Sequence, residues 1–128
     1  MSLGINGIDH FVLTVTDIDR TLHFYGNILG MTIETFDKNR MAIRMGNQKI
    51  NLHIVGEDIL PRAAKASSGS GDFCLISSRA IEELIPEIEA KGVVIERGPI
   101  AQTGATGPLR SIYLRDPDNN LVEIANKI

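Results

Sequence analysis

The chain has 128 residues, and its 43% hydrophobic and 23% charged residues are the proportions of an ordinary globular domain. Its 13 basic and 16 acidic residues give a net charge of -3, without a run of like charge that indicates a nucleic-acid or membrane partner. No hydrophobic stretch approaches the roughly 18 residues of a membrane span, and no secretory signal is recognised. We expect a cytoplasmic protein with a small-molecule partner, and the single cysteine agrees with a reducing compartment.

The sequence contains one internal repeat. The segments LGMTIE at 29–34 and KGVVIE at 91–96 are 62 positions apart, and each follows a stretch with helical spacing of hydrophobic residues. The same offset aligns the strand-like segment around His10 with that around Asp72. The chain is therefore predicted to consist of two equivalent modules.

The first module is predicted to be a strand, a helix and three strands. Hydrophobic residues alternate over 11–15, as in a half-buried strand. A helix follows over 17–29, with an aspartate at its start and Gly30 where a left-handed residue ends it. Alternation and polar turns then predict strands over 31–36, 41–45 and 49–55.

The second module repeats this order. A strand over 72–76 precedes a helix over 81–88, in which Pro86 is expected to distort the first turn. The remaining strands are predicted over 93–97, 109–115 and 120–125. Residues 99–108 are interpreted as a flap or plain turn. We assign about 5–56 to module one, 57–70 to a linker and about 71–126 to module two, within a single domain over 1–128.

The polar faces of the strands predict a site. Hydrophobic residues mark the face of each strand that packs in the core, so the alternating polar residues share the other face. That face collects His10, Arg40, Arg44, Asn51, His53, Asp72, Cys74, Ser111, Tyr113, Arg115 and Glu123. Two histidines and a carboxylate suit Zn²⁺, Ni²⁺, Mn²⁺ or Fe²⁺ and leave coordination positions open.

Three segments resemble the vicinal oxygen chelate superfamily, which includes glyoxalases, bleomycin-resistance proteins and dioxygenases. They are GIDHFVLTVTDIDRTLHFYGNILGM, INLHIVG and SIYLRDPDNNLVEI, and within the superfamily they are similar to a glyoxalase-domain branch that includes virulence-associated bacterial proteins. The resemblance implies an α+β fold in which two βαβββ modules form a cup-shaped mixed sheet. It also implies metal ligands on the first and last strands of each module.

Transferred residue by residue, the resemblance implies His10, His53 and Glu123 as metal ligands and Asp72 as a fourth candidate. Glyoxalase I usually has His, Glu, His and Glu at these positions, so the second histidine here is interpreted as a relocated ligand. Unequal turns leave open whether Glu123 corresponds to Asn51 or to His53. Glu123 and Asp72 are also the candidate catalytic residues, either of which can act as a general base.

The other polar residues are candidates for substrate binding. Arg44, Asn51, Tyr113 and Arg115 are assigned to this role, because arginine binds carboxylate or phosphate in a forked geometry. Ion pairing at the surface is an equal alternative for each arginine. Cys74 faces the same way and is read as a packing residue.

The resemblance implies a metal-dependent lyase or isomerase in which a divalent ion chelates two neighbouring substrate oxygens. Two alternatives remain: an Fe²⁺ ring-cleaving dioxygenase, and a metal-independent binding or sequestration protein of the bleomycin-resistance type. Only 5% of the residues are aromatic and none is Trp, which disfavours binding by stacking. A homodimer is expected because family members commonly pair.

Overall fold

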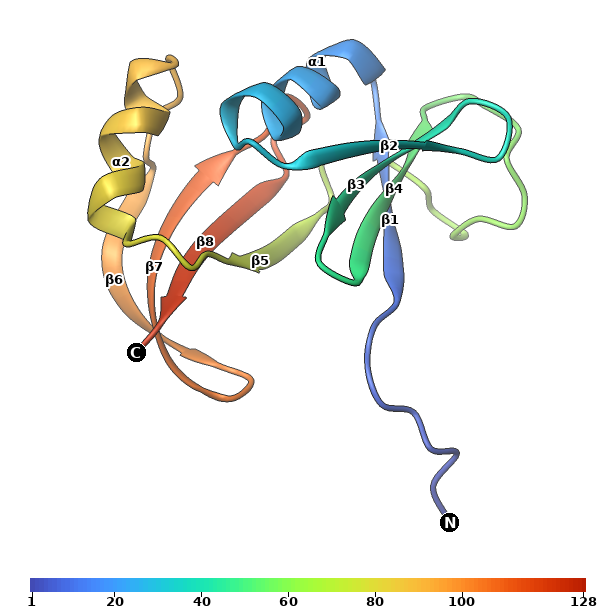
Figure 1. Ribbon diagram of the computed structural model, residues 1–128. Helices are drawn as coiled ribbons and strands as arrows, with labels where there is room; N and C mark the ends of the chain where they lie inside the picture. Colours follow the sequence, from blue (N-terminus) through green and yellow to red (C-terminus); the bar gives the residue numbers. More distant parts are fainter. The chain divides into compact units, whose positions relative to one another are not determined.

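The computed structural model describes all 128 residues, which form two compact units, Met1–Ser67 and Ser68–Ile128. Each unit contains one four-stranded sheet, in the order β1-β4-β3-β2 in the first and β5-β8-β7-β6 in the second. Each sheet starts with a parallel pair and continues with antiparallel pairs (Figure 1). The predicted α+β class with two repeated modules is confirmed.

The first unit follows the predicted order of elements. These are β1 (His10–Val15), α1 (Ile18–Leu22), the π-helix η1 (His23–Ile28), β2 (Thr32–Phe36), β3 (Arg40–Met45) and β4 (Gln48–Ile54). The side chain of Asp17 accepts a hydrogen bond from the Arg20 amide at 3.1 Å and caps the helix, and Gly30 follows it in the left-handed region at φ 70°. The wide final turn, with Leu29 N bonded to Phe24 O at 3.0 Å, is a difference from the expected α-helix.

The core of the first unit lies against one face of its sheet. Residues that face one another across the ladders share a face, and one face presents a buried hydrophobic set: Leu13, Val15, Ile43, Ile50 and Leu52. Phe24 and Tyr25 of η1 are also buried and pack edge to face, with ring centroids 4.9 Å apart. The opposite face is left to the polar residues.

The second unit comprises β5 (Asp72–Ile76), α2 (Ile81–Ala90), β6 (Arg97–Gly104), β7 (Gly107–Arg115) and β8 (Leu121–Lys127). Helix α2 runs unbroken through Pro86, although the proline removes one backbone donor. The side chain of Asn126 secures the start of the helix. It accepts a hydrogen bond from Ile81 N at 2.8 Å and donates to Ser77 O and Arg79 O at 3.0 and 2.7 Å.

The predicted strand over 93–97 and the flap or plain turn over 99–108 are wrong in their bounds, because β6 begins only at Arg97 and the turn is confined to residues 105–106. The chain forms a long hairpin there, with β6 paired to β7 and a bulge between Arg97 and Ile100 (Figure 1). Gly98 has φ 100°, and a Cβ at this position would collide with Ser111 O, so only glycine permits this close approach of strands. Glycine and proline in β6 conceal the strand from pattern analysis.

The DPDNN segment forms the β7–β8 turn. Asp116 Oδ1 accepts hydrogen bonds from the backbone of Asp118 at 2.9 Å and Asn120 at 3.0 Å, while its Oδ2 accepts from Asn120 Nδ2 at 2.8 Å. Asn120 Oδ1 in turn accepts from Gly71 N at 2.7 Å. The most specific motif of the sequence therefore ties the starts of β8 and β5 together.

Candidate functional site

The strand registers determine which residues of the two units are equivalent. His10 faces Lys49 in the first unit, and Asp72 faces Leu121 in the second. Asn51 lies two residues beyond Lys49, as Glu123 lies two residues beyond Leu121. Glu123 is therefore the equivalent of Asn51, and the ambiguity left by the sequence is removed.

Asn51 and Glu123 share an uncommon feature. Asn51 Oδ1 and Glu123 Oε2 are both buried and have no hydrogen-bond partner. A buried polar oxygen without a partner costs roughly 1–3 kcal/mol, more when it carries charge, so such oxygens are rare in folded proteins. Buried atoms without a partner also occur at Arg40 Nε and Ser111 Oγ. Asn51 and Glu123 differ from these in that they occupy equivalent positions of the repeat.

His10 and Asp72 occupy the second pair of equivalent positions. The Nδ1–H of His10 donates to Asp9 Oδ1 at 2.8 Å, which leaves Nε2 of the neutral ring with its lone pair. This hydrogen bond lowers the pKa of Asp9. Asp72 begins β5, is exposed and forms no hydrogen bond or ion pair.

His53 lies apart from His10. Both residues are on the polar face, but His53 faces Thr14, four residues along the β1–β4 ladder from His10. Four strand residues span roughly 13 Å. The register therefore places the backbone of His53 farther from His10 than that of Asn51, which lies only two residues along the ladder.

The surroundings of His53 are basic. Arg40 Nη2 lies 3.2 Å from His53 Nε2, and the residue is only 6% exposed. Burial, and then the positive charge of Arg40, lower the pKa of His53, so the ring is neutral at pH 7. The guanidinium of Arg40 also stacks at 4.9 Å on the ring of Phe36.

The two arginines assigned to substrate binding form equivalent ion pairs. Arg44 contacts both carboxylate oxygens of Glu34 at 3.3 and 3.2 Å, and Arg115 contacts both oxygens of Glu96 at 3.1 and 3.2 Å. All four side chains are partly exposed. These forked contacts join neighbouring strands or segments of each unit, which is the alternative role that the sequence left open.

Glu123 on β8 lies between two titratable side chains of the neighbouring strands. It faces Cys74 on β5 and Tyr113 on β7. Although Cys74 is exposed as a residue, protein atoms exclude water from part of its thiol and, with the nearby Glu123 carboxylate, raise its pKa from 9.0 to about 11. Burial and the same carboxylate also raise the pKa of Tyr113, whose hydroxyl accepts a hydrogen bond from Gln102 at 2.8 Å.

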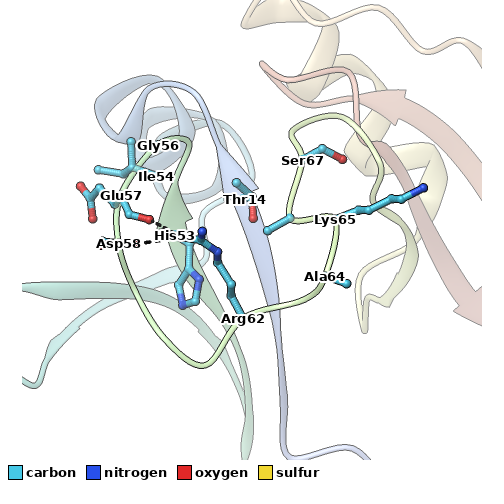
Figure 2. A pocket seen from close by; sticks show the side chains of 11 residues that line it. Thr14, His53, Ile54, Gly56, Glu57, Asp58, Arg62, Ala64, Lys65 and Ser67 are labelled. Atoms are coloured by element: carbon cyan, nitrogen blue, oxygen red, sulfur yellow. Dashed lines mark hydrogen bonds and ion pairs between the residues drawn. The ribbon is translucent and has the colours of Figure 1, made fainter.

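The first unit also contains a cavity of about 340 Å³. Figure 2 shows the side chains that line it, among them Thr14, His53, Arg62 and Lys65. Thr14 and Arg62 are not among the site residues predicted from the sequence. Arg62 belongs to the segment that was interpreted as a linker. The alternation of β1 would have placed Thr14 on the polar face.

His10 and Asn51 belong to the first unit, and Asp72 and Glu123 belong to the second. No group of three or more His, Cys, Asp or Glu side chains that could hold a metal ion is found in the structure. None of its helices has the length and hydrophobicity needed to cross a membrane.

Comparison with known proteins identifies relatives along nearly the whole chain. Residues 7–124 match the Glyoxalase/Bleomycin resistance protein/Dioxygenase superfamily. The chain is 47% identical over 124 residues to virulence protein STM3117 of Salmonella typhimurium, a match that covers 97% of this chain and 86% of that protein. It is 40% identical over 124 residues to glyoxalase domain-containing protein RDO1 of Mycosarcoma maydis, covering 97% of this chain and 70% of that protein.

Solved structures give the same result. Integron cassette protein VCH_CASS1 from the mobile metagenome of V. cholerae is 41% identical, with a TM-score of 0.96 and coverage of 100% of both chains. The resemblance predicted from the sequence motifs is confirmed, as is the branch with a virulence-associated bacterial protein.

Proposed function

The chain belongs to the glyoxalase/bleomycin resistance protein/dioxygenase superfamily, and on this premise we propose that it is a divalent-metal-dependent lyase or isomerase acting on a small substrate with two neighbouring oxygens. His10, Asn51 and Glu123 are the proposed metal ligands, and Asp72 is the proposed general base. Asn51 takes the place of His53 in this set, because the register separates His53 from His10.

One observation carries the proposal: the two buried oxygens without partners, Asn51 Oδ1 and Glu123 Oε2, occupy equivalent positions of the repeat. A cation bound at either position would satisfy the oxygen there and offset the cost of burying it. Superfamily membership supplies the second support, since its members commonly use divalent metals.

The donor chemistry fits a divalent ion. Asp9 holds the Nδ1–H of His10, which is the arrangement by which a second carboxylate orients a metal-binding imidazole and leaves Nε2 for the metal. One imidazole, one amide oxygen and one carboxylate suit Mn²⁺ or Fe²⁺ better than the sulfur-preferring ions. When bound, such an ion acts as a Lewis acid on the two substrate oxygens.

The remaining residues have roles in proton transfer and enclosure. Asp72 has an exposed carboxylate without a partner, so it could accept a proton from the substrate carbon next to the two oxygens. Tyr113 and Cys74 flank Glu123 and stay protonated at neutral pH, because their pKa values are raised. Both can then serve as neutral hydrogen-bond donors near the substrate.

Metal analysis tests the proposal. Protein purified without chelator is expected to retain Mn²⁺ or Fe²⁺, and His10→Ala is expected to lose it. His23→Ala, which removes an exposed helical histidine, is the matched control. Equal metal content in wild type and His10→Ala would contradict the proposal.

The reaction class requires a separate test. Asp72→Asn should keep the metal and lose turnover in a panel of 2-oxoaldehyde adducts and related substrates. Oxygen uptake by the Fe²⁺-loaded protein with catechol-type substrates would instead indicate a ring-cleaving dioxygenase. We also propose that the protein is a cytoplasmic homodimer, since family members commonly pair, and light scattering after size exclusion tests the dimer.

A further inference from the structure

The cavity of the first unit presents hydrogen-bond donors that no part of the protein uses. Its volume of about 340 Å³ is at the lower end of the range for small-molecule sites, about 300–1,000 Å³. Thr14 on β1 and His53 on β4 face each other across the parallel ladder, and Arg62 approaches from the segment after β4 (Figure 2). None of these three residues belongs to the proposed metal site.

The tautomer of His53 follows from its partner. Arg40 is always protonated and has only donors, so the nitrogen that it contacts, Nε2 of His53, must be the acceptor. With Nε2 as the acceptor, the ring proton is on Nδ1. This Nδ1–H has no partner within the protein, and its residue lines the cavity. The cavity wall therefore offers a fixed donor, backed by the positive charge of Arg40.

Thr14 and Arg62 add further donors. The hydroxyl of Thr14 forms no hydrogen bond. Arg62 Nη1 donates to Glu57 O at 2.9 Å and lies 3.7 Å from Asp58 Oδ1, which leaves the other N–H groups of its guanidinium unused. Three kinds of donor thus line one small cavity.

The acidic residues of the lining do not cancel this preference. In Figure 2 the carboxylate of Glu57 points away from His53, and the side chain of Lys65 also extends away from it. Asp58 contacts Arg62 only at ion-pair distance, 3.7 Å, with 94% of its side chain exposed. The positive charge of Arg40 lies behind His53, so the charges around these donors favour an anion.

We propose that this cavity binds a small organic anion through a carboxylate or phosphate group, with Thr14, His53 and Arg62 as donors, and that it does so without a metal ion. Oxyanions are the acceptors that match this set, because they accept several hydrogen bonds and because charged partners make hydrogen bonds about twice as strong. The site goes beyond the proposed function, since its residues and those of the metal site are distinct.

The binding test uses metal-free protein labelled with nitrogen-15. It is titrated with sodium acetate, inorganic phosphate and sodium chloride at equal ionic strength, while the amide signals of Thr14, His53 and Arg62 are followed. Saturable shifts at all three with acetate or phosphate, but not with chloride, are expected. The stronger of the two probes identifies the group as carboxylate or phosphate.

Variants locate the site. Arg62→Gln should weaken binding about tenfold or more, and Thr14→Val should weaken it severalfold, as charged and neutral hydrogen bonds are lost. Lys65→Gln is the matched control: it removes a positive charge from the same lining segment and should leave affinity within about twofold. Absence of saturable shifts, or equal weakening in Lys65→Gln and Arg62→Gln, would overturn the proposal. The amide spectrum of each variant also shows that it is folded.

Discussion

The two units share the same strand ladders but carry opposite chemistry on their polar faces. The first unit presents His10, His53, Arg40 and Arg44, and the second presents Asp72, Cys74, Tyr113 and Glu123. Each unit has one equivalent arginine–glutamate ion pair, Arg44–Glu34 in the first and Arg115–Glu96 in the second. A repeated backbone thus determines where side chains lie, whereas the residues placed there determine what each unit can bind.

The turn before the last strand should show the largest difference in stability. In the second unit Asp116 is buried and accepts three hydrogen bonds, so Asp116→Ala is expected to lower the free energy of unfolding by about 3 kcal/mol. Asn47 in the corresponding turn of the first unit is exposed, and Asn47→Ala should change the free energy of unfolding by less than about 0.5 kcal/mol. Denaturant titration measures both. Equal effects would mean that Asp116 does not organise the turn.

The thiol of Cys74 should react slowly. With a pKa of about 11 in place of 9.0, its thiolate fraction at pH 8, and hence its alkylation rate, falls about a hundredfold. The rate should continue to rise with pH up to about 11. Glu123→Gln removes a cause of the shift and should lower the apparent pKa.

The equivalent position in the first unit provides the control. Val12 corresponds to Cys74 and faces the neutral Asn51. In a Cys74→Ser background, Val12→Cys should react with iodoacetamide at a rate closer to that of an ordinary thiol. Identical pH–rate profiles at the two positions would show that Glu123 does not affect Cys74.

Introducing a negative charge at position 51 should alter the affinity for the metal ion. Asn51→Asp adds a second carboxylate to the proposed ligand set and should strengthen Mn²⁺ binding about tenfold, since affinity follows ligand charge. In the metal-free state the same change buries a charge, so thermal stability should fall. Calorimetric titration measures the affinity. Unchanged affinity would indicate that Asn51 does not contact the ion.

The equivalent arginine–glutamate ion pairs, one in each unit, should contribute least to the free energy of unfolding. Arg44→Ala and Arg115→Ala are each expected to lower the free energy of unfolding by less than about 1 kcal/mol, because their side chains are partly exposed. Added salt should reduce both effects alike. A large effect on catalysis from one arginine alone would reassign it to substrate binding.

Sequence patterns predicted much of this fold for a physical reason. Strand alternation identified the polar face correctly at Asn51, His53 and Glu123, because side chains alternate with period two. It did not predict β6, where Gly98 and Pro99 permit a close approach of strands that no hydrophobic pattern records.

The candidate site was predicted less completely, because face and register are separate properties. Alternation tells which side of a strand His53 is on, but only the β1–β4 pairing shows that it lies beside Thr14 and four residues from His10. Similarly, Arg62 lies in a segment without periodicity, so only the folded chain brings it to the cavity of His53.

The most direct test of the proposed site compares the metal affinity of two variants, Asn51→Leu and His53→Gln. If Asn51 and Glu123 are repeat-equivalent ligands, Asn51→Leu should weaken Mn²⁺ binding about tenfold or more, while His53→Gln should leave it unchanged within about twofold. Loss of metal binding in His53→Gln together with full binding in Asn51→Leu would contradict the proposed site and restore His53 as the ligand.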